Sequence, residues 1–315
     1  MATILITRQL PGDGVAALAG HTLIGPKHDD SPYTPDELLA IAPNVDAIVS
    51  LLTDEIGAKL LTVGSAGRLR MVANVAVGYN NIDTETARSL GVLVSNTPGV
   101  LDETTADTAF LLILSACRLA DEAGADLRSG RWRGWGINQY LGQDVHGATL
   151  GIVGYGRIGQ AVAQRATGFG MRVIHHSRND TGVDGYVADL DELLATSDIV
   201  SLHTPLTPAT THLIDARRLA LMKPHAVLIN TARGPVVDEA ALAEALHTGV
   251  IFGAGLDVYE HEPIVHERLL SAPRTVLLPH IGSGSMATRH KMVTMACESV
   301  ATMLRGEIPP NLVAN

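Results

Sequence analysis

The sequence predicts an α/β protein with two domains, each built on a parallel β-sheet. Three observations support this fold class: apolar strand-like runs alternate with helical patterns, the chain has 315 residues, and a glycine-rich turn joins one strand to a helix. A chain of this length exceeds one small core and fits two domains of ordinary size. Because parallel strands are connected by helices, we expect helices on both faces of each sheet.

The first domain begins with a β-α unit. Residues 3–7 form an apolar run typical of a buried strand, and the turn at 11–14 leads into an Ala-rich stretch at 15–19 that suits a short helix. Further strand-like runs, separated by helical patterns, lie at 46–50, 70–75 and 91–95. The sequence Asn96-Thr97-Pro98-Gly99 ends this series, because Pro cannot continue a central strand. We therefore place the first domain boundary there.

A long helix and a second alternating series follow. The pattern over 102–119 predicts a helix, with Asp102 and Glu103 near its positive end. A loop at 131–136 precedes strands and helices that alternate from 149 to about 282. We expect the closing helix, roughly 286–307, to pack back on the first domain and make that domain discontinuous. The expected domains are 1–97 with 286–315, and 98–285.

Composition and charge exclude several classes of partner. The net charge of −10 and the pI near 5.7 argue against a nucleic-acid groove or an anionic membrane surface, since both need clustered Lys and Arg. Two cysteines are too few for a disulfide framework, and no His pair has metal-ligand spacing with a carboxylate, so we expect no metal. The apolar run at the N-terminus is too short for a signal peptide or a membrane span, which predicts a cytoplasmic protein.

A glycine-rich turn opens the second series. Residues 149–153 predict a buried strand, Gly154-Tyr155-Gly156-Arg157-Ile158-Gly159 follows directly, and 161–166 is helical. The first glycine makes the tight turn, the second lets backbone amides approach a pyrophosphate, and the third lets helix and strand pack closely. The helix N-terminus can then face the anion. A glycine triplet can also be merely structural, but the flanking strand and helix favour dinucleotide binding.

The end of the next strand bears on the choice of dinucleotide. After the strand predicted at 171–176, a carboxylate would hold the ribose diol of NAD, but this sequence has Ser177 and Arg178. A hydroxyl and a guanidinium suit a 2′-phosphate, so NADP(H) is favoured. The alternative is that Arg178 is a solvated loop charge and the protein accepts NAD(H).

Three polar residues follow predicted strands of the glycine-loop domain. Arg233 comes after 226–230, Glu262 after 254–258, and His280 after 275–279, at the sheet edge where α/β proteins bind ligands. A guanidinium can grip a carboxylate, and a carboxylate beside an imidazole favours the imidazolium, a proton donor. These are the groups that reduction of a small 2-keto acid requires. Taken singly, each could be structural: a surface charge, the start of a turn, or one of 13 histidines.

The chain resembles the D-isomer-specific 2-hydroxyacid dehydrogenases through nearly its whole length. The resemblance is carried by the glycine loop 154–159 and by these further segments: Val75-Ala76-Val77-Gly78-Tyr79-Asn80-Asn81-Ile82-Asp83, Asn96-Thr97-Pro98-Gly99-Val100, Asp198-Ile199-Val200-Ser201-Leu202-His203-Thr204-Pro205-Leu206, Asn230-Thr231-Ala232-Arg233-Gly234, Gly255-Leu256-Asp257-Val258 with Glu262, and Pro279-His280-Ile281-Gly282. It implies a Rossmann-type dinucleotide-binding domain and a discontinuous flavodoxin-like substrate domain.

The resemblance also implies roles for individual residues. Arg233, Glu262 and His280 would be catalytic, and Asp257 would contact the nicotinamide carboxamide. Further cofactor-binding residues would be Thr104, His203, Thr204, Pro205, Thr231 and Ala232. The substrate would be bound by the amides of Val77 and Gly78, by the loop at Leu52-Thr53 and by Ser283. One departure concerns the run 282–289 after His280, where many relatives have Ser-Ala-Thr without an insertion, so the pocket beyond His280 stays undefined.

Within the family, the loop at 131–135 and the Ser177-Arg178 pair look most like glyoxylate and hydroxypyruvate reductases. That likeness implies a homodimer joined through the second domain, with Trp135 entering the partner's site; ordinary packing is the alternative for both tryptophans. Two alternatives for the function remain. The protein could be an NAD-linked dehydrogenase of the 2-ketogluconate or D-lactate type, or a corepressor that senses nucleotides with the same fold. Glu262 speaks against a formate dehydrogenase, which carries Gln there. An S-adenosylmethionine-dependent methyltransferase would fit the glycine turn but would assign no role to Arg233 and His280.

Overall fold

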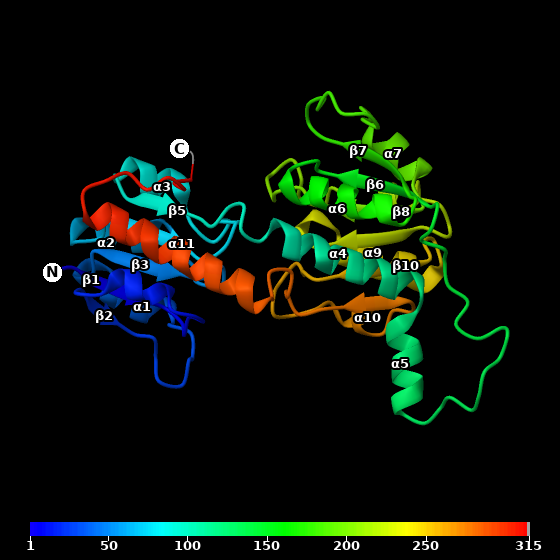
Figure 1. The fold of residues 1–315 in the computed structure, drawn as a ribbon, viewed down its shortest axis with the longest axis horizontal. Helices are drawn as coiled ribbons and strands as arrows, with labels where there is room; N and C mark the ends of the chain where they lie inside the picture. The colour runs from blue at the N-terminus through cyan, green and yellow to red at the C-terminus, as the bar shows by residue number, and fades with distance from the viewer. Residues whose placement is uncertain (314–315) are drawn as a thin grey trace. The chain divides into compact units, whose positions relative to one another are not determined.

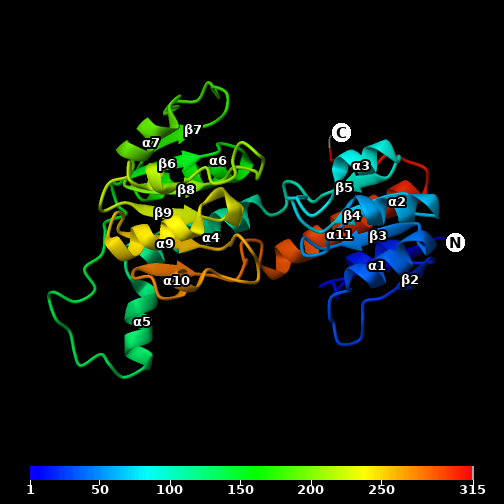
Figure 2. The same cartoon turned by 180° about the vertical axis from the view of Figure 1, so that it is seen from behind.

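The chain folds into two compact units, each built on one parallel sheet (Figures 1 and 2). A computed structural model describes residues 1–313. One unit combines Met1–Leu101 with the chain from Ser283 onward, and the other is Asp102–Gly282. These boundaries lie a few residues from the expected ones at 97/98 and 285/286. The predicted α/β class is confirmed, and so is the discontinuity of the first unit.

The first unit has a five-stranded sheet in the order β2-β1-β3-β4-β5. Its strands are β1 (Thr3–Ile6), β2 (Thr22–Ile24), β3 (Ala47–Ser50), β4 (Met71–Asn74) and β5 (Leu93–Ser95), all parallel. This is the flavodoxin-like order, whose switch point lies between β1 and β3. Loops that follow these two strands therefore form the edge where this sheet type binds ligands.

Helices cover both faces of this sheet. α1 (Pro35–Ile41), α2 (Ala58–Ala66) and α3 (Thr84–Ser89) lie on one face, with the short 3-10 turn η2 (Ala42–Asn44). The 3-10 helix η1 (Gly14–Leu18) and α11 (Met286–Leu304) pack together on the other. Every residue of β3 and β4 is buried, as a strand covered on both faces requires. α11 thus returns the end of the chain to the first unit.

The second unit has a six-stranded sheet in the order β11-β10-β9-β8-β6-β7. Its strands are β6 (Thr149–Val153), β7 (Arg172–His176), β8 (Ile199–Leu202), β9 (Val227–Asn230), β10 (Gly253–Leu256) and β11 (Thr275–Leu277). A parallel bridge between His175 and Tyr186 stands beyond β7, where a Rossmann sheet has a further strand. The order reverses at β6, so the glycine turn that follows β6 lies at the switch point of a Rossmann-type sheet.

The second unit buries a separate apolar cluster on each face of its sheet. α4 (Asp102–Cys117) and α6 (Arg157–Gly168) cover one face around Leu112, Ile152 and Val162. α7 (Leu190–Thr196), α8 (Ala216–Leu219), α9 (Glu239–Thr248) and α10 (Glu267–Leu270) cover the other. α5 (Ala120–Arg128) and the loop after it project from the rest of this unit (Figure 1). Within residues 1–313, no helix is long and apolar enough to span a membrane.

Two sequence expectations need correction, and one strand was not predicted. The helix predicted over 102–119 ends at Cys117, because Leu119 adopts a left-handed conformation with φ 53° and α5 then starts in a new direction. Gln143 donates its amide proton to the Cys117 carbonyl at 2.7 Å, which satisfies that helix end. The helix expected at 15–19 is the 3-10 helix η1. The edge strand β2 was not predicted, because two of its three residues are exposed and form no apolar run.

Candidate active site

The expected reactive side chains follow three neighbouring strands at one edge of the second sheet. Arg233 follows β9, Glu262 follows β10 and His280 follows β11. The Nδ1 atom of His280 lies 2.8 Å from the Oε2 atom of Glu262, and both side chains are about one quarter to one third exposed. Arg233 follows β9 and is half-buried, and its charge acts on Glu262. The structure therefore brings Glu262 and His280 into contact, with Arg233 as an electrostatic neighbour of Glu262.

The carboxylate of Glu262 is held in its ionised form. Its Oε1 atom accepts a hydrogen bond from the Tyr259 amide at 3.1 Å, while Oε2 pairs with His280. Burial by itself raises the pKa of Glu262, but the hydrogen bond and charge of His280, the Tyr259 amide and Arg233 outweigh it, so the net pKa is lowered. The ionised carboxylate accepts a hydrogen bond from the imidazole and so orients its ring.

Arg233 sits on a loop with tightly fixed backbone. Asn230, the last residue of β9, donates from Nδ2 to the Arg233 carbonyl at 2.9 Å and accepts the Ala232 amide at 3.0 Å. A Cβ atom at Gly234 would lie 1.8 Å from the carbonyl carbon of Tyr259, so only glycine allows the loops after β9 and β10 to pack together. Burial lowers the pKa of Arg233, and Glu262 opposes this shift; the guanidinium stays charged at neutral pH.

The backbone of His280 is held in an uncommon conformation by Asp257. His280 has φ 55°, in the left-handed region that few non-glycine residues adopt. The two carboxylate oxygens of buried Asp257 accept the amides of Ile281 and Gly282, each at 2.7 Å. Burial raises the pKa of Asp257, and the two amides counteract the rise. Asp257 thus fixes the turn that carries His280.

The glycine turn after β6 has the geometry of a phosphate cradle. A Cβ atom at Gly154 (φ 97°) would lie 2.7 Å from the His203 backbone, and one at Gly159 would lie 2.2 Å from the Gly154 carbonyl oxygen. By contrast, a Cβ atom at Gly156 would meet nothing within 4 Å, so this glycine leaves open space at the start of α6. A helix N-terminus with open space before it is suited to an anion such as a pyrophosphate.

Buried hydroxyl groups near the same edge lack partners. Among the residues that the structure describes, 1–313, Thr204 Oγ1 and Thr231 Oγ1 are buried and have no hydrogen-bond partner, which is expected of groups that bind a ligand. Thr204 follows β8, which is the neighbour of β6 in the sheet, and Thr231 follows β9, the next strand beyond β8. These residues and the cradle fit a dinucleotide.

The sequence of the second unit matches a protein-family model. Residues 110–282 match the model described as D-isomer specific 2-hydroxyacid dehydrogenase, NAD binding domain. The chain belongs to the D-isomer specific 2-hydroxyacid dehydrogenase family. The resemblance noted in the sequence is thereby confirmed, together with a Rossmann-type NAD-binding domain.

The similarity to known proteins extends over the sequence of both units. A glyoxylate reductase of Thermococcus onnurineus is 45% identical over 319 residues, which cover 98% of this chain and 95% of the relative. The crystal structure of the TT0316 protein of Thermus thermophilus has a TM-score of 0.93 at 42% identity and covers 99% of this chain and 100% of that one. An NADPH-dependent glyoxylate/hydroxypyruvate reductase of Sinorhizobium meliloti, solved with NADP and malonate, has a TM-score of 0.85 at 33% identity and covers 99% and 97%.

Ser177 and Arg178, the residues expected to contact the 2′ position of the ribose, directly follow β7. Ser177 Oγ accepts the amide of Tyr155 in the glycine turn at 3.0 Å, which places the hydroxyl beside the cradle. Arg178 is exposed. The backbone of His203 lies beside Gly154 of the glycine turn. Burial lowers the pKa of its imidazole to about 4, and its Nε2 atom lies 2.8 Å from Ser201 Oγ. His203 is therefore neutral at physiological pH.

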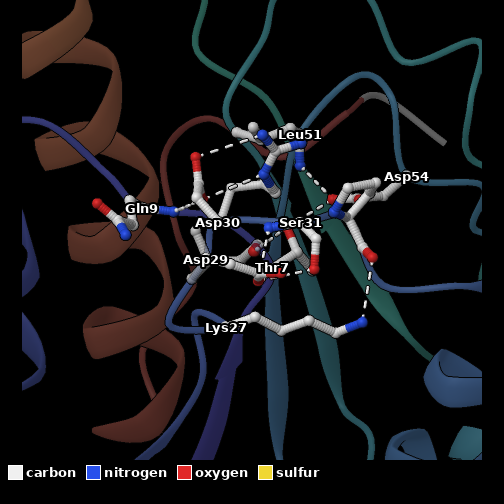
Figure 3. Close-up of polar contacts among 11 residues, drawn as sticks. Thr7, Gln9, Lys27, Asp29, Asp30, Ser31, Leu51 and Asp54 are labelled. Atoms are coloured by element: carbon white, nitrogen blue, oxygen red, sulfur yellow. Dashed lines mark hydrogen bonds and ion pairs between the residues drawn. The ribbon is translucent and has the colours of Figure 1, made fainter.

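The substrate residues expected in the first unit lie at the carboxyl edge of its sheet. Thr7, after β1, donates its hydroxyl to Asp54 at 2.5 Å, and the Leu51 amide donates to the same carboxylate at 2.8 Å (Figure 3). Asp54 thereby fixes the loop that contains Leu52 and Thr53. Val77 and Gly78 follow β4 in the same unit. Leu52, Val77 and Gly78 thus belong to one edge of one sheet.

The other residues expected to bind cofactor or substrate lie on several different elements. Thr104 lies in the first turn of α4, Pro205 follows β8, and Ala232 precedes Arg233. Trp135 is 80% exposed in the loop after α5. The carbonyl of Ser283 accepts the Ser285 amide, and Ser285 caps α11 by accepting the Thr288 amide. The run 282–289 thus forms the capped start of α11.

Two supporting residues were missed from the sequence. Asn230 brackets the Arg233 loop, and Tyr259 holds Glu262 through its amide while its hydroxyl donates to the Leu278 carbonyl at 2.9 Å, just before His280. Asn230 carried a usable signal, because Asn is unfavourable in strands and ends an otherwise apolar one. Tyr259 carried none, since its role depends on a contact with a residue 19 positions away.

Proposed function

We propose that the protein reduces a small 2-keto acid, with glyoxylate or hydroxypyruvate favoured, to the D-2-hydroxy acid by hydride transfer from NADPH. The observation that carries this proposal is the His280–Glu262 pair, which stands beside Arg233 at the edge that also holds the glycine cradle. The relatives named glyoxylate reductase and glyoxylate/hydroxypyruvate reductase support the choice of substrate.

In this proposal each reactive side chain has one task. The bound nicotinamide supplies the hydride, and the glycine turn with Thr204 and Thr231 holds the dinucleotide. The Arg233 guanidinium binds the substrate carboxylate, together with the amides of Val77 and Gly78. His280 donates its proton to the carbonyl oxygen as the alkoxide forms, and Glu262 holds the imidazole in its orientation through Nδ1. Holding both reactants in place supplies much of the acceleration.

The proposed function is tested by mixing the purified protein with NADPH or NADH and a series of 2-keto acids while the absorbance of the reduced nicotinamide is followed. Consumption with glyoxylate or hydroxypyruvate is the expected result. Turnover of only larger keto acids, or of NADH alone, would point instead to the 2-ketogluconate or D-lactate type. Nucleotide binding without turnover of any keto acid would contradict the enzyme and favour a nucleotide sensor.

The preference for NADPH is proposed from Ser177 and Arg178. The double variant Ser177→Asp with Arg178→Ala places a carboxylate near the ribose and removes the cation, so the ratio of kcat/KM for NADPH over NADH should fall by about tenfold or more. Initial rates with both cofactors at saturating keto acid measure the ratio. The matched control is Arg172→Ala, an exposed arginine at the start of the same strand. An unchanged ratio in the double variant would exclude these residues as the determinant.

We propose that the protein forms a homodimer through an apolar surface on α5 and the following loop. This α5-loop surface comprises Leu127, Trp132, Trp135, Ile137 and Leu141, which are 46% to 80% exposed. Five large apolar side chains exposed within 15 residues favour an association site over a solvated loop. In the proposed dimer, Trp135 reaches the substrate site of the partner.

Light scattering should give about twice the 33.2 kDa mass of one chain. The double variant Leu127→Glu with Ile137→Glu should give monomers, whereas Leu270→Glu, at an equally exposed leucine of α10, should leave the mass unchanged. Trp135→Ala should lower kcat/KM for the keto acid while the dimer persists. A monomeric wild-type chain would contradict the proposed dimer, and an unchanged kcat/KM would limit Trp135 to packing.

A further inference from the structure

The loop that follows β4 has three consecutive carbonyl groups that are bound by donors of the first unit. The Ala76 carbonyl accepts the Thr97 amide at 2.9 Å, the Val77 carbonyl accepts Asn96 Nδ2 at 2.8 Å, and the Gly78 carbonyl accepts Asn74 Nδ2 at 2.9 Å. Two of the three donors are side-chain amides. The orientation of each peptide plane in this loop is therefore fixed by a specific residue.

Fixing a carbonyl also fixes the N–H group of the same peptide. These peptide bonds are trans, and in a trans peptide the N–H points opposite to the C=O. The N–H groups of Val77, Gly78 and Tyr79 are thus each turned away from the donor behind them. Within residues 1–313, none of the three N–H groups has a protein acceptor. Val77 and Gly78 are half-buried and Tyr79 is partly exposed, so a ligand can reach this loop.

Neighbouring N–H groups without an acceptor are an anion-binding element. An unpaired, half-buried amide is costly unless a ligand or water satisfies it. The loop follows β4 at the carboxyl edge of a flavodoxin-like sheet, beside the loop after β3 that borders the switch point where this sheet type binds ligands. The ligand that suits three amide donors is an oxyanion such as a carboxylate.

Asn74 has a fully buried side chain that no step of the proposed reaction uses. Its Oδ1 atom accepts the Ser50 hydroxyl at 3.1 Å, and its Nδ2 atom lies 3.3 Å from Asn81 Oδ1 as well as bonding Gly78. Asn81 in turn donates to the carbonyls of Leu51 and Asp54, at 3.0 and 2.9 Å. Asn74 therefore joins the loop after β4 to the loop that contains Leu52.

We propose that Asn74 is a positioning residue that sets the Gly78–Tyr79 peptide so that the amides of Val77, Gly78 and Tyr79 bind the carboxylate of the 2-keto acid. The inference rests on the proposed function and adds the Tyr79 amide as a third donor. Asn96 acts in the same way on the preceding peptide. Neither side chain touches the substrate; each acts through the backbone that it holds.

The variant Asn74→Asp tests this inference, because it keeps the shape of the side chain and removes the donor. The Gly78 carbonyl then faces an oxygen and its peptide rotates. We expect KM for glyoxylate to rise by about tenfold or more, since a hydrogen bond to a charged group is lost, while kcat falls much less. The dissociation constant of NADPH, measured by fluorescence titration, should be unchanged. Oxamate, a stable analogue of a 2-keto acid, should inhibit correspondingly less.

Asn96→Asp is the second variant, because Asn96 is only half-buried and its replacement is less demanding for folding. The same rise in KM is expected. The matched control is Asn44→Asp, where an exposed Asn of the same unit also donates to a backbone carbonyl, that of Ala40 at 3.2 Å. KM in this control should equal that of the wild type.

The outcomes separate this inference from the proposed function. If the wild-type chain reduces glyoxylate but folded Asn74→Asp and Asn96→Asp proteins keep the wild-type KM and oxamate inhibition, the positioning role is overturned and the proposed function stands. If Asn44→Asp changes kcat and KM as much as Asn74→Asp and Asn96→Asp do, the effect is one of stability and the positioning role is also overturned. A wild-type chain that reduces no 2-keto acid contradicts both.

Discussion

Replacing His280 by Gln is expected to lower kcat for keto-acid reduction by about 10² to 10⁴-fold, the contribution of a positioned general acid. Gln can still donate an amide N–H to Glu262, which lies 2.8 Å from Nδ1, but an amide proton is not acidic enough to be transferred to the substrate oxygen. The dissociation constant of NADPH should hardly change, because the glycine cradle is formed by other strands. Steady-state kinetics with glyoxylate and a fluorescence titration with NADPH measure both quantities.

The matched control for His280 is His225→Gln. His225 is also paired with a carboxylate, since its Nε2 atom lies 3.0 Å from Asp198 Oδ1, but it is half exposed and lies outside the proposed site. Its replacement should leave kcat unchanged. Equal kcat in the His280→Gln and wild-type enzymes would exclude His280 as the proton donor.

Replacing Arg233 by Ala is expected to raise KM for the keto acid by about 100-fold, because a charge-assisted pair worth about 3 kcal/mol is removed. Arg233→Lys keeps the charge but loses the planar fork, so it should recover only part of the affinity. Steady-state kinetics over a wide range of glyoxylate concentration measure the change.

Arg217→Ala is the control for Arg233, since the Arg217 guanidinium is mostly exposed and pairs with Asp191 on the surface. KM should then stay at the wild-type value. If Arg233→Ala has the same KM as this control, Arg233 does not anchor the substrate carboxylate.

The sequence was sufficient for those parts of the site that depend on local pattern. Arg233, Glu262 and His280 each follow an apolar run that forms a strand, and parallel strands bring such ends to one edge of a sheet. The contact between His280 and Glu262 follows from the adjacency of β10 and β11. The glycine spacing predicted a tight turn at Gly154, an open approach at Gly156 and close helix–strand packing at Gly159. In the structure, a Cβ atom would clash at Gly154 and Gly159 and would meet nothing at Gly156.

Features that depend on distant contacts could not be predicted from the sequence. Asp257 holds the amides that follow His280, 24 and 25 positions later in the chain, and this depends on how two loops meet. The end of α4 at Cys117 had no glycine or proline to signal it, because the break rests on the left-handed conformation of Leu119. Asn74 lies inside the run predicted as a strand at 70–75, and its role depends on a bond to Gly78 that only the loop geometry shows.

Transfer of deuterium tests the central claim most directly. The protein is incubated with glyoxylate and NADPH that carries deuterium at the transferable position of the nicotinamide, and the product is analysed by mass spectrometry. Direct hydride transfer predicts glycolate with one deuterium on its hydroxyl-bearing carbon, formed by the wild type and suppressed in His280→Gln. Glycolate without deuterium, or cofactor oxidation that is independent of glyoxylate, would contradict this account of the site.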